Sequence, residues 1–529
     1  MRLKSRDNII LTTVFAVIGA LSIIIYFIFR SIVFLGPGYN FWDRIFAIML
    51  LMGDLFFFVN SIGYSIDVIR ANYYYVNKFE KEHYFLTVAE PDVAVFITAF
   101  NEDGGTLEGT VSICALMSYR NKKIYLLDDS SDPELIITAR EIADRYGIEY
   151  RHRKDRRGYK AGAINEVLKE IDAEYLLVLD ADQRPSHDFL NEIVPIMESE
   201  IELAFVQTPQ FYVNRKINRV AEAAYAQQAV FYTYICEGKS VANAVFACGT
   251  NMVMRVSALR DVGGFDEETV TEDLATSFNL HRKGYSSYYY NHVFVEGEGP
   301  MNIPGYYKQQ MRWAYGNITV LKKVLWNLIT DPGSMTLAQW AEYLLSCTWY
   351  FVGLAYFFLM LCPVAFLLFD IHPFHVTDNV AYIFCYLPYL IFSFFQFFVT
   401  MYMRGYSARE ILLGITTTFL TFPIFMKATF YALIGRKIPF VVTPKVSDGR
   451  TPLKYFLPQI AMMILITISA VIGFVKIFHQ FTVPLLMNIL WCLYYLVLIQ
   501  RFRYFLENGS EASTYYKDIF KVDRQEERD

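Results

Sequence analysis

In Tyr175-Leu-Leu-Val-Leu-Asp-Ala-Asp182, five apolar residues run directly into two carboxylates. Val93–Ile97 and Ile124–Leu127 are apolar runs of the same kind, and each also ends in polar residues. Such runs are typical of buried parallel strands, whose two faces are both covered. Polar helical patterns at Ser131–Tyr146 and Lys160–Ile171 fill the gaps between them. The middle of the chain is therefore predicted to be an open, Rossmann-like α/β domain.

Acidic residues follow all three predicted strands. These segments are Thr98–Glu102, Asp128-Asp129 and Asp180-Ala-Asp182. The carboxyl ends of parallel strands meet at one edge of a sheet, where ligands bind. Carboxylates brought close together repel one another, so a cluster of them usually holds a cation. Oxygen ligands favour Mg²⁺ or Mn²⁺. The alternative is that each Asp caps the helix that follows it.

Apolar residues are concentrated before residue 70 and after residue 338. They make up 54% of the chain, aromatic residues make up 17%, and the net charge of −5 gives no sign of nucleic-acid binding. The first apolar run is longer than a typical signal-peptide core. Six runs are long enough to cross roughly 30 Å of hydrocarbon as helices: about Ile9–Phe34, Ile45–Ile69, Ala341–Phe369, Ala381–Met403, Leu457–Ile477 and Val483–Ile499.

A seventh apolar segment, Glu410–Gly435, differs from the six. Pro423 and Lys427 interrupt it, and basic residues flank it on both sides. This pattern predicts an amphipathic helix that lies at the membrane interface, with a seventh or paired span as the alternative.

Basic residues predict the orientation of the chain. Arg70, Lys78 and Lys81 flank the middle domain, whereas the loop Asp370–Asp378 has no Lys or Arg. Short loops rich in Lys and Arg stay in the cytosol. We therefore expect a multi-pass protein of the cell membrane with a cytosolic middle domain. The expected units are 1–75 (two spans), 80–335 (α/β domain), 338–403 (two spans), 405–450 (interfacial helix and loop), 455–503 (two spans) and 504–529 (cytosolic tail).

Three further motifs lie in the middle domain. They are Lys160-Ala-Gly-Ala-Ile-Asn165, Val270-Thr-Glu-Asp273 and Gln309-Gln-Met-Arg312-Trp313. Taken alone, Thr271 reads as a helix N-cap and Lys160 as a surface lysine. Together with Asp180-Ala-Asp182, the motifs resemble those of family 2 glycosyltransferases with a GT-A fold. Thr-Glu-Asp and Gln-x-x-Arg-Trp resemble those of the processive synthases, the cellulose synthases above all.

This resemblance implies a donor site. In the family, Asp-x-Asp holds the Mg²⁺ or Mn²⁺ that bridges a nucleotide diphosphate, which assigns Asp180 and Asp182 to the metal. A lysine at a helix start can meet phosphate charge, helped by the helix dipole. The other donor residues implied are Thr98, Phe100 and Glu102 around the base, Asp129 with Asp128 at the uracil and ribose, Lys160 and Asp180 near the phosphates, and Gln309 and Arg312.

The same resemblance implies the chemistry. Asp273, next to Glu272, becomes the candidate general base for the acceptor hydroxyl. The fixed fork of donors on Arg312 suits the leaving diphosphate, and Trp313 offers a flat face for the terminal sugar of the acceptor. Phe246–Asn251 and Val206–Asn214 resemble further stretches of the cellulose synthases, and the first of them places Cys248, Gly249 and Thr250 at the acceptor.

Phe440-Val-Val-Thr-Pro-Lys445 matches F-x-V-T-x-K. In cellulose synthases this motif is a gating loop over the donor pocket, so Thr443 and Lys445 are expected to reach the diphosphate. The alternative is a juxtamembrane linker, which its prolines would suit. The chain also departs from bacterial cellulose synthases, because two spans rather than four precede the catalytic domain and only a short tail follows the last span.

The expected activity is therefore processive, inverting synthesis of a cellulose-like β-glucan from UDP-glucose, with the polymer threaded through the membrane helices. The expected partners are the UDP-sugar, the nascent polysaccharide and membrane lipid, with no nucleic acid; an export partner is left open. One alternative is a hyaluronan- or chitin-type synthase that uses UDP-N-acetylglucosamine. Another is a non-processive enzyme with a lipid acceptor. A transporter should carry charges inside its spans, and these spans read as nearly charge-free.

Overall fold

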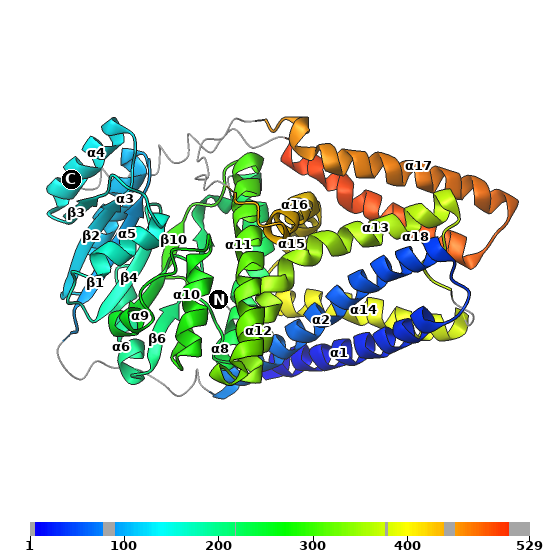
Figure 1. Cartoon of the computed structure of the whole chain (residues 1–529), viewed down its shortest axis with the longest axis horizontal. Helices are drawn as coiled ribbons and strands as arrows, with labels where there is room; N and C mark the ends of the chain where they lie inside the picture. The colour runs from blue at the N-terminus through cyan, green and yellow to red at the C-terminus, as the bar shows by residue number, and fades with distance from the viewer. Residues whose placement is uncertain (1–5, 78–89, 217, 376–378, 439–449, 507–529) are drawn as a thin grey trace.

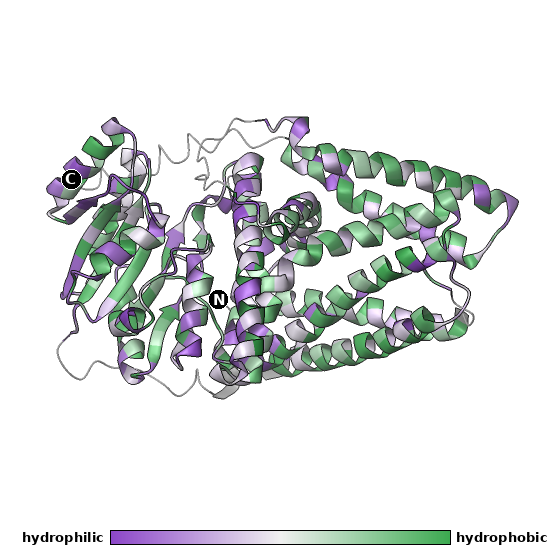
Figure 2. Cartoon of the chain, viewed as in Figure 1, coloured by the Kyte–Doolittle hydropathy of each residue, from purple (hydrophilic) through white to green (hydrophobic). Residues whose placement is uncertain are grey.

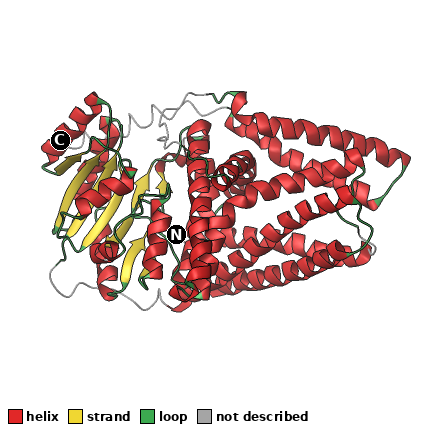
Figure 3. Ribbon diagram, viewed as in Figure 1, coloured by secondary structure: helices red, strands yellow, loops and turns green. Residues whose placement is uncertain are grey.

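The computed structural model describes residues 6–77, 90–216, 218–375, 379–438 and 450–506. An α/β domain forms one end of the molecule and a bundle of long helices forms the other (Figure 1). All strands lie in the α/β domain (Figure 3). The predicted fold class is confirmed.

The main sheet has seven strands in the order β3-β2-β1-β4-β8-β6-β9. Its first four strands are parallel, and their apolar sequences match the predicted runs. β8, however, is antiparallel to both of its neighbours, so the sheet is mixed rather than wholly parallel. The strands are β1 (Val93–Ala99), β2 (Lys122–Asp128), β3 (Glu149–His152), β4 (Tyr175–Asp180), β6 (Leu203–Gln207), β8 (Met252–Arg255) and β9 (Ser286–Tyr289). A small second sheet has the order β5-β10-β7, formed by Arg184–Pro185, Val295–Gly297 and Phe211–Tyr212.

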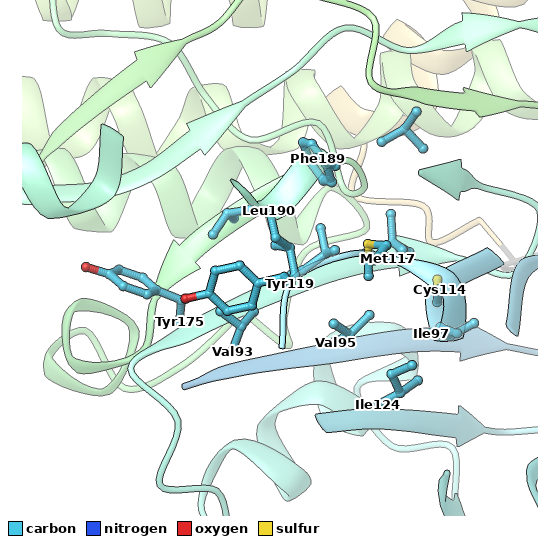
Figure 4. Close-up of a cluster of buried hydrophobic side chains, with 14 of the residues drawn as sticks. Val93, Val95, Ile97, Cys114, Met117, Tyr119, Ile124, Tyr175, Phe189 and Leu190 are labelled. Atoms are coloured by element: carbon cyan, nitrogen blue, oxygen red, sulfur yellow. The ribbon is translucent and has the colours of Figure 1, made fainter. Parts of the chain in front are cut away.

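Helices cover both faces of the main sheet because both faces are apolar. Val93, Val95 and Ile97 of β1 pack with α3, α4 and α6 (Figure 4). Ala94 and Phe96, which point the other way along the pleat, pack with α5 and α9. The helices of this domain are α3 (Gly104–Leu116), α4 (Pro133–Tyr146), α5 (Tyr159–Leu168), α6 (Phe189–Ser199), α7 (Arg219–Val230), α8 (Cys236–Val241), α9 (Val256–Asp261) and α10 (Glu272–Arg282), with short turns η1 (Val213–Lys216) and the π-helix η2 (Phe231–Ile235).

Six helical segments of the described chain are long and apolar enough to cross a membrane, as predicted, and green apolar residues dominate them in Figure 2. The long helices of the bundle run side by side away from the α/β domain (Figure 1). They are α1 (Arg6–Leu35), α2 (Phe41–Asn77), α13 (Val352–Phe369), α14 (Asn379–Met403), α17 (Leu457–His479) and α18 (Val483–Ile499), and short turns η5 (Leu453–Phe456) and η6 (Gln500–Phe505) flank the last two. The chain is a multi-pass membrane protein.

Four helices lie between the domain and the bundle. α11 (Ile303–Thr330) stands across the direction of the long helices (Figure 1), and α12 (Leu337–Thr348) packs against it through Trp340. The predicted span Ala341–Phe369 lies within the apolar helical segment Leu337–Phe369, in which the short turn η4 (Trp349–Phe351) joins α12 to α13. A further short turn, η3 (Pro332–Ser334), precedes α12.

The predicted single helix Glu410–Gly435 is instead two helices, α15 (Ala408–Leu420) and α16 (Phe422–Leu433), bent by 46° at their junction. Pro423, in the first turn of α16, explains the break, because proline lacks an N–H and cannot continue a helix. The bend leaves both alternatives open, an interfacial pair or a broken span.

Candidate active site

Asp273 lies in the first turn of α10 and is half-buried against the loop before β8. Its Oδ1 accepts a hydrogen bond of 2.8 Å from the backbone N–H of Leu274. A Cβ built on Gly249 would lie 3.2 Å from Asp273 Oδ2, so only glycine leaves this approach unhindered. Gly249 also has a φ of +81°, which favours glycine. The predicted acceptor segment and the predicted base are thus in contact.

Burial sets the protonation of this carboxylate. Loss of water, reinforced by the neighbouring Glu272 carboxylate, raises the pKa of Asp273 to about 7, against the opposing effect of the Leu274 N–H, Lys160 and Arg312. Burial likewise raises the pKa of Glu272, while Lys160 and Arg312 act in the other direction. A base whose pKa lies near neutral pH is well matched to proton transfer.

Lys160 joins this region to the end of β4. Its ammonium forms an ion pair with the carboxylate of Asp180 and donates a hydrogen bond of 2.6 Å to the carbonyl oxygen of Gly249. The N–H of Asp180 donates to the hydroxyl of Thr250 at 3.0 Å. Residues from α5, β4 and the loop before β8, far apart in sequence, therefore meet at one point.

Gln309 and Arg312 are one turn apart on α11 and face the same region. Gln309 lies close to the Tyr212 hydroxyl, which is also within electrostatic reach of Asp182 and Arg312; burial raises the pKa of Tyr212 to about 12. Asp182 accepts a hydrogen bond of 3.2 Å from Gln183. Asp182 and the Gln-x-x-Arg-Trp motif thus both lie near Tyr212. Trp313 is half-buried, next to Arg312 on α11.

Cys248 belongs to the buried side of the site. Its N–H donates to the side-chain oxygen of Gln207 at 2.7 Å. The same Gln207 amide donates to the Thr250 carbonyl at 2.9 Å, so one buried side chain at the end of β6 fixes the acceptor segment. Burial, followed by the nearby Asp273 carboxylate, raises the pKa of the Cys248 thiol. It is therefore a neutral thiol and not a nucleophile.

The carboxylates at the end of β2 are hydrogen-bonded to nearby residues of the protein. Asp128 accepts hydrogen bonds from the Tyr150 hydroxyl (2.8 Å) and the Ser130 N–H (2.9 Å). Asp129 takes two bonds from one guanidinium, 2.8 Å from Arg153 Nε and 2.6 Å from Arg153 Nη2. A fork of this kind is a strong, planar contact. The sequence did not single out Tyr150 or Arg153.

The residues at and after the end of β1 also contact neighbouring parts of the chain. The guanidinium carbon of Arg156 lies 3.3 Å from the centre of the Phe100 ring, a cation–π contact. The hydroxyl of Thr98 donates to the carbonyl of Leu179 in the neighbouring strand at 3.2 Å. Glu102 is half-buried nearby in sequence. Phe100 therefore offers a flat face at this end of the site, and a guanidinium covers it.

The predicted residues form two groups of contacts at neighbouring strand ends, where Thr98 of β1 is paired in register with Asp180 of β4. One group of predicted residues is brought together by contacts and electrostatic reach: Lys160, Asp180, Cys248, Gly249, Thr250, Glu272, Asp273 and Arg312. Asp128, Asp129, Thr98 and Phe100 instead contact the chain around them. The predicted gate residues Thr443 and Lys445 lie outside the described residues.

The carboxylates at the end of β4 are the candidates for holding a metal ion. Within the described ranges, no group of three or more His, Cys, Asp and Glu side chains is arranged to hold one. Two carboxylates, Asp180 and Asp182, stand at the end of β4, and the side chain of Asp180 is 47% exposed. Mg²⁺ commonly takes one or two protein carboxylates and completes its shell with phosphate oxygens and water. The residues present fit a cation of that kind.

A family model described as "Glycosyl transferase family group 2" matches residues 175–506, more than half of the chain. The chain belongs to this family. The match covers the end of β4, the acceptor segment, α10 and α11, which carry most of the site described above. This glycosyltransferase has a GT-A-like catalytic domain with a mixed sheet, joined to apolar membrane helices.

Several curated proteins are similar to this glycosyltransferase. The "Cellulose synthase catalytic subunit [UDP-forming]" of Pseudomonas fluorescens strain SBW25 is 30% identical over 314 residues, 57% of this chain and 41% of that protein. The "Probable glucomannan 4-beta-mannosyltransferase 2" of Oryza sativa subsp. japonica is 30% identical over 272 residues, 50% of this chain and 46% of that protein. The matches therefore span less than half of each relative's own length.

Among solved structures, a mannosyltransferase from Pyrobaculum calidifontis in complex with GDP-Man and Mn²⁺ is 15% identical. The superposition has a TM-score of 0.49 and covers 73% of this chain and 100% of the other.

Proposed function

We propose that this glycosyltransferase is a processive, inverting synthase that builds a β-glucan from UDP-glucose and passes the polymer across the membrane. The observation that carries the proposal is that Asp273 lies within electrostatic reach of two cationic side chains. Lys160 and Arg312 both act electrostatically on this carboxylate. A glycosyl transfer site needs this combination, a base on the acceptor side and positive charge on the side of the departing diphosphate.

Asp273 is the proposed general base. The acceptor hydroxyl oxygen attacks the anomeric carbon of the donor, and the bond between that carbon and the diphosphate oxygen breaks. Asp273 takes the proton of the hydroxyl. A single displacement of this kind inverts the anomeric configuration and needs no covalent nucleophile. The pKa of about 7 supports this role, because the carboxylate is available near neutral pH and still basic enough to hold the proton.

Positive charge compensates the leaving group. The diphosphate gains charge as its bond to the sugar breaks, and Arg312 offers a rigid fork of donors for phosphate oxygens. Lys160, at the start of α5, is the second cation. Asp180 and Asp182 would hold Mg²⁺ or Mn²⁺, which supplies further neutralisation of the diphosphate. The family resemblance adds Gln309, Thr443 and Lys445 to this side of the site.

Asp129 and Phe100 mark the proposed nucleoside end. Thr98 is near the end of β1, Phe100 and Glu102 follow this strand, and Asp129 follows the adjacent strand β2. Arg153 holds both carboxylate oxygens of Asp129, so this residue is oriented before any donor arrives. Asp128, which is 1% exposed, acts in this proposal by fixing the loop through Tyr150 rather than by direct contact.

A line of aromatic rings supports passage of the polymer. Tyr350, in η4, lies within electrostatic reach of Asp273 and Cys248. From the neighbouring Trp349, successive ring contacts lead through the bundle towards its far end: Trp349–Phe56, Phe56–Phe57, Phe57–Tyr356, Tyr356–Phe419, Phe419–Tyr495, Tyr495–Trp491, Trp491–Tyr386 and Tyr386–Tyr382. Flat apolar rings with polar edges suit the apolar faces and hydroxyl edges of a sugar chain.

The location follows from the same proposal. A synthase that uses a cytosolic nucleotide sugar needs its α/β domain in the cytosol, and the basic residues beside the spans favour that orientation. We assign the protein to the cell membrane. We also assign the terminal sugar of the growing polymer to the face of Trp313.

The relatives do not agree on which hexose is transferred. Their names include both cellulose synthases and mannosyltransferases. The test is a donor screen with the detergent-purified full chain, in which UDP-glucose, UDP-N-acetylglucosamine and GDP-mannose are each supplied with Mg²⁺ or Mn²⁺. UDP-glucose is expected to give the fastest release of nucleoside diphosphate. Faster turnover of UDP-N-acetylglucosamine would favour a hyaluronan- or chitin-type synthase. Transfer to lipid alone would favour a non-processive enzyme.

A further inference from the structure

An ion pair is buried inside the helical bundle. Arg30 of α1 donates from Nε to Asp54 Oδ2 of α2 at 2.9 Å, and the two side chains are 0% and 10% exposed. The spans are therefore not as free of charge as their sequence suggested. A buried ion pair contributes little net stability, because desolvation offsets the attraction. Charged residues inside membrane spans are expensive and usually serve a function.

Arg30 has more donors than its partner uses. Its Nη1 and Nη2 atoms are buried and have no hydrogen-bond partner within the described residues. Asp54, in contrast, accepts from both Arg30 Nε and the hydroxyl of Tyr26, at 3.4 Å. Buried N–H groups without partners carry a desolvation penalty that a hydrogen-bond acceptor would remove. The guanidinium therefore has unused capacity for an acceptor-rich ligand.

Aromatic rings lie beside this ion pair. The ring of Phe374 lies 4.5 Å from its central carbon. Tyr26, one helical turn before Arg30, stacks on Tyr389 of α14, with ring centres 4.6 Å apart and planes inclined by 5°. The ring centres of Tyr26 and Tyr386 are 5.4 Å apart. Tyr386 in turn contacts the ring of Trp491 of α18, so it continues the line of rings. The pair thus lies at one end of the aromatic line described above.

The position of Arg30 along the bundle is also informative. It lies one turn before α1 ends at Leu35, at the end of the bundle far from the α/β domain (Figure 1). A polymer that leaves the catalytic site along the aromatic line meets this pair last.

We propose that Arg30 and Asp54, together with Tyr26, Tyr386 and Tyr389, form a binding site for an uncharged sugar unit of the polymer near its exit. This inference rests on the proposed function. Sugar hydroxyls accept hydrogen bonds from the free guanidinium nitrogens, and the tyrosine rings pack against the apolar face of the sugar.

Charge decides which polymer fits. Asp54 balances Arg30, so the pair as a whole is neutral. A uronate unit would add a carboxylate to a site shielded from water, leaving it with a net negative charge at a high desolvation cost. The site therefore favours a neutral glycan over an acidic one.

The experiment uses the detergent-purified full chain in a Trp313→Ala background, which removes the proposed acceptor platform. The probes are cellohexaose and an oligogalacturonate of equal length, and their binding is followed by the fluorescence of Trp491 and the other tryptophans. The double variant Arg30→Met/Asp54→Leu keeps the site neutral and filled. It should weaken cellohexaose binding by about fivefold, the worth of roughly one net hydrogen bond. The oligogalacturonate should bind at least that much more weakly than cellohexaose to the unaltered pair.

Arg44→Met is the matched control. Arg44 is a second arginine at this end of the bundle, but its guanidinium donates to the carbonyls of Phe34 and Gly36. Its variant should bind cellohexaose as before. Equal cellohexaose affinity in the double variant, or equal affinity for the acidic probe, would overturn the proposal. If the double variant does not fold, Arg30→Lys keeps the ion pair but not the fork of donors, and unchanged affinity there overturns the proposal too.

The two proposals fail separately. If the unaltered chain makes no polymer from any nucleotide sugar but cellohexaose binding still depends on Arg30 and Asp54, the proposed function is wrong and the saccharide site stands. If polymer is made and the binding does not depend on the pair, the site is wrong and the synthase stands.

Discussion

Lys160 pairs with Asp180 while its ammonium also holds the carbonyl oxygen of Gly249. One side chain thus connects a proposed metal ligand, a proposed phosphate site and the loop that approaches the base. Any cation that binds Asp180 competes with this ammonium, and any diphosphate attracts it. We therefore expect the pair to couple the binding of metal and nucleotide.

Replacement of Lys160 should separate these two effects. In Lys160→Met, Asp180 loses its counter-ion, so Mn²⁺ alone should bind about two- to fivefold more tightly, as expected for a partly exposed ion pair. UDP should bind more weakly in the same variant, because a phosphate contact is lost. Isothermal titration of each ligand measures both effects. Lys154→Met, which removes a second lysine from the basic segment Arg151–Lys160, is the control. A change in the same direction for both ligands would contradict the coupling.

The metal site itself is tested by Asp182→Asn. This change should weaken metal-dependent UDP binding, and turnover of the unaltered chain should cease in excess EDTA, because the diphosphate then leaves without neutralisation. Gln183→Leu, which removes only the neighbouring amide that donates to Asp182, should have a smaller effect on UDP binding. Full turnover in EDTA is the outcome that would exclude a metal-dependent mechanism.

Protonation of Asp273 should lower kcat at acidic pH. Its pKa of about 7 means that the carboxylate becomes protonated as the pH falls through 7, so kcat should decline below that pH. Asp273→Asn should lower turnover by about two to four orders of magnitude and abolish this pH dependence, while UDP affinity stays nearly unchanged. Asp261→Asn, at an exposed carboxylate paired with Lys283, is the control. A collapse of UDP affinity in Asp273→Asn would instead indicate a structural or metal-linked role.

Substitutions at Trp313 and in the predicted gate should impair different steps of the reaction. Trp313→Ala removes the acceptor platform, so elongation should stop while UDP-glucose still binds. Thr443→Ala and Lys445→Ala should weaken donor retention and increase hydrolysis of the UDP-sugar, because a loop that closes over the donor also excludes water. Assays of polymer, bound donor and free glucose separate the three results. Wild-type rates of polymer synthesis in all three variants would show that the processive assignment is wrong.

The sequence predicted the sheet core well because its strands are continuous apolar runs. β1, β2 and β4 lie where Val93–Ile97, Ile124–Leu127 and Tyr175–Leu179 indicated. The antiparallel β8 was missed, because its four residues, Met252–Arg255, carry no pattern that shows direction. The membrane helices followed from hydropathy, but the turn at η4 did not, since Trp349–Phe351 is as apolar as the helices on either side.

The motifs allowed candidate site residues to be proposed, but they did not predict the contacts of these residues. The motifs gave Lys160, Asp180 and Asp273, which the structure brings together. The fork between Arg153 and Asp129 depends on how the loop before α5 folds back, with Gly158 and Tyr159 both at positive φ. No spacing rule encodes such a path. Arg30 and Asp54 were overlooked because a single charge hardly changes the hydropathy of a long apolar run.

The most direct test of the central claim is polymer formation in sealed, inside-out membrane vesicles supplied with radiolabelled UDP-glucose and Mg²⁺. The account predicts long, labelled chains inside the vesicles, resistant to an added endo-β-1,4-glucanase until detergent opens the membrane and digested by it afterwards. Asp273→Asn vesicles should contain none. Label that appears only in lipid extracts or in short soluble sugars, with no protected polymer, would contradict the claim.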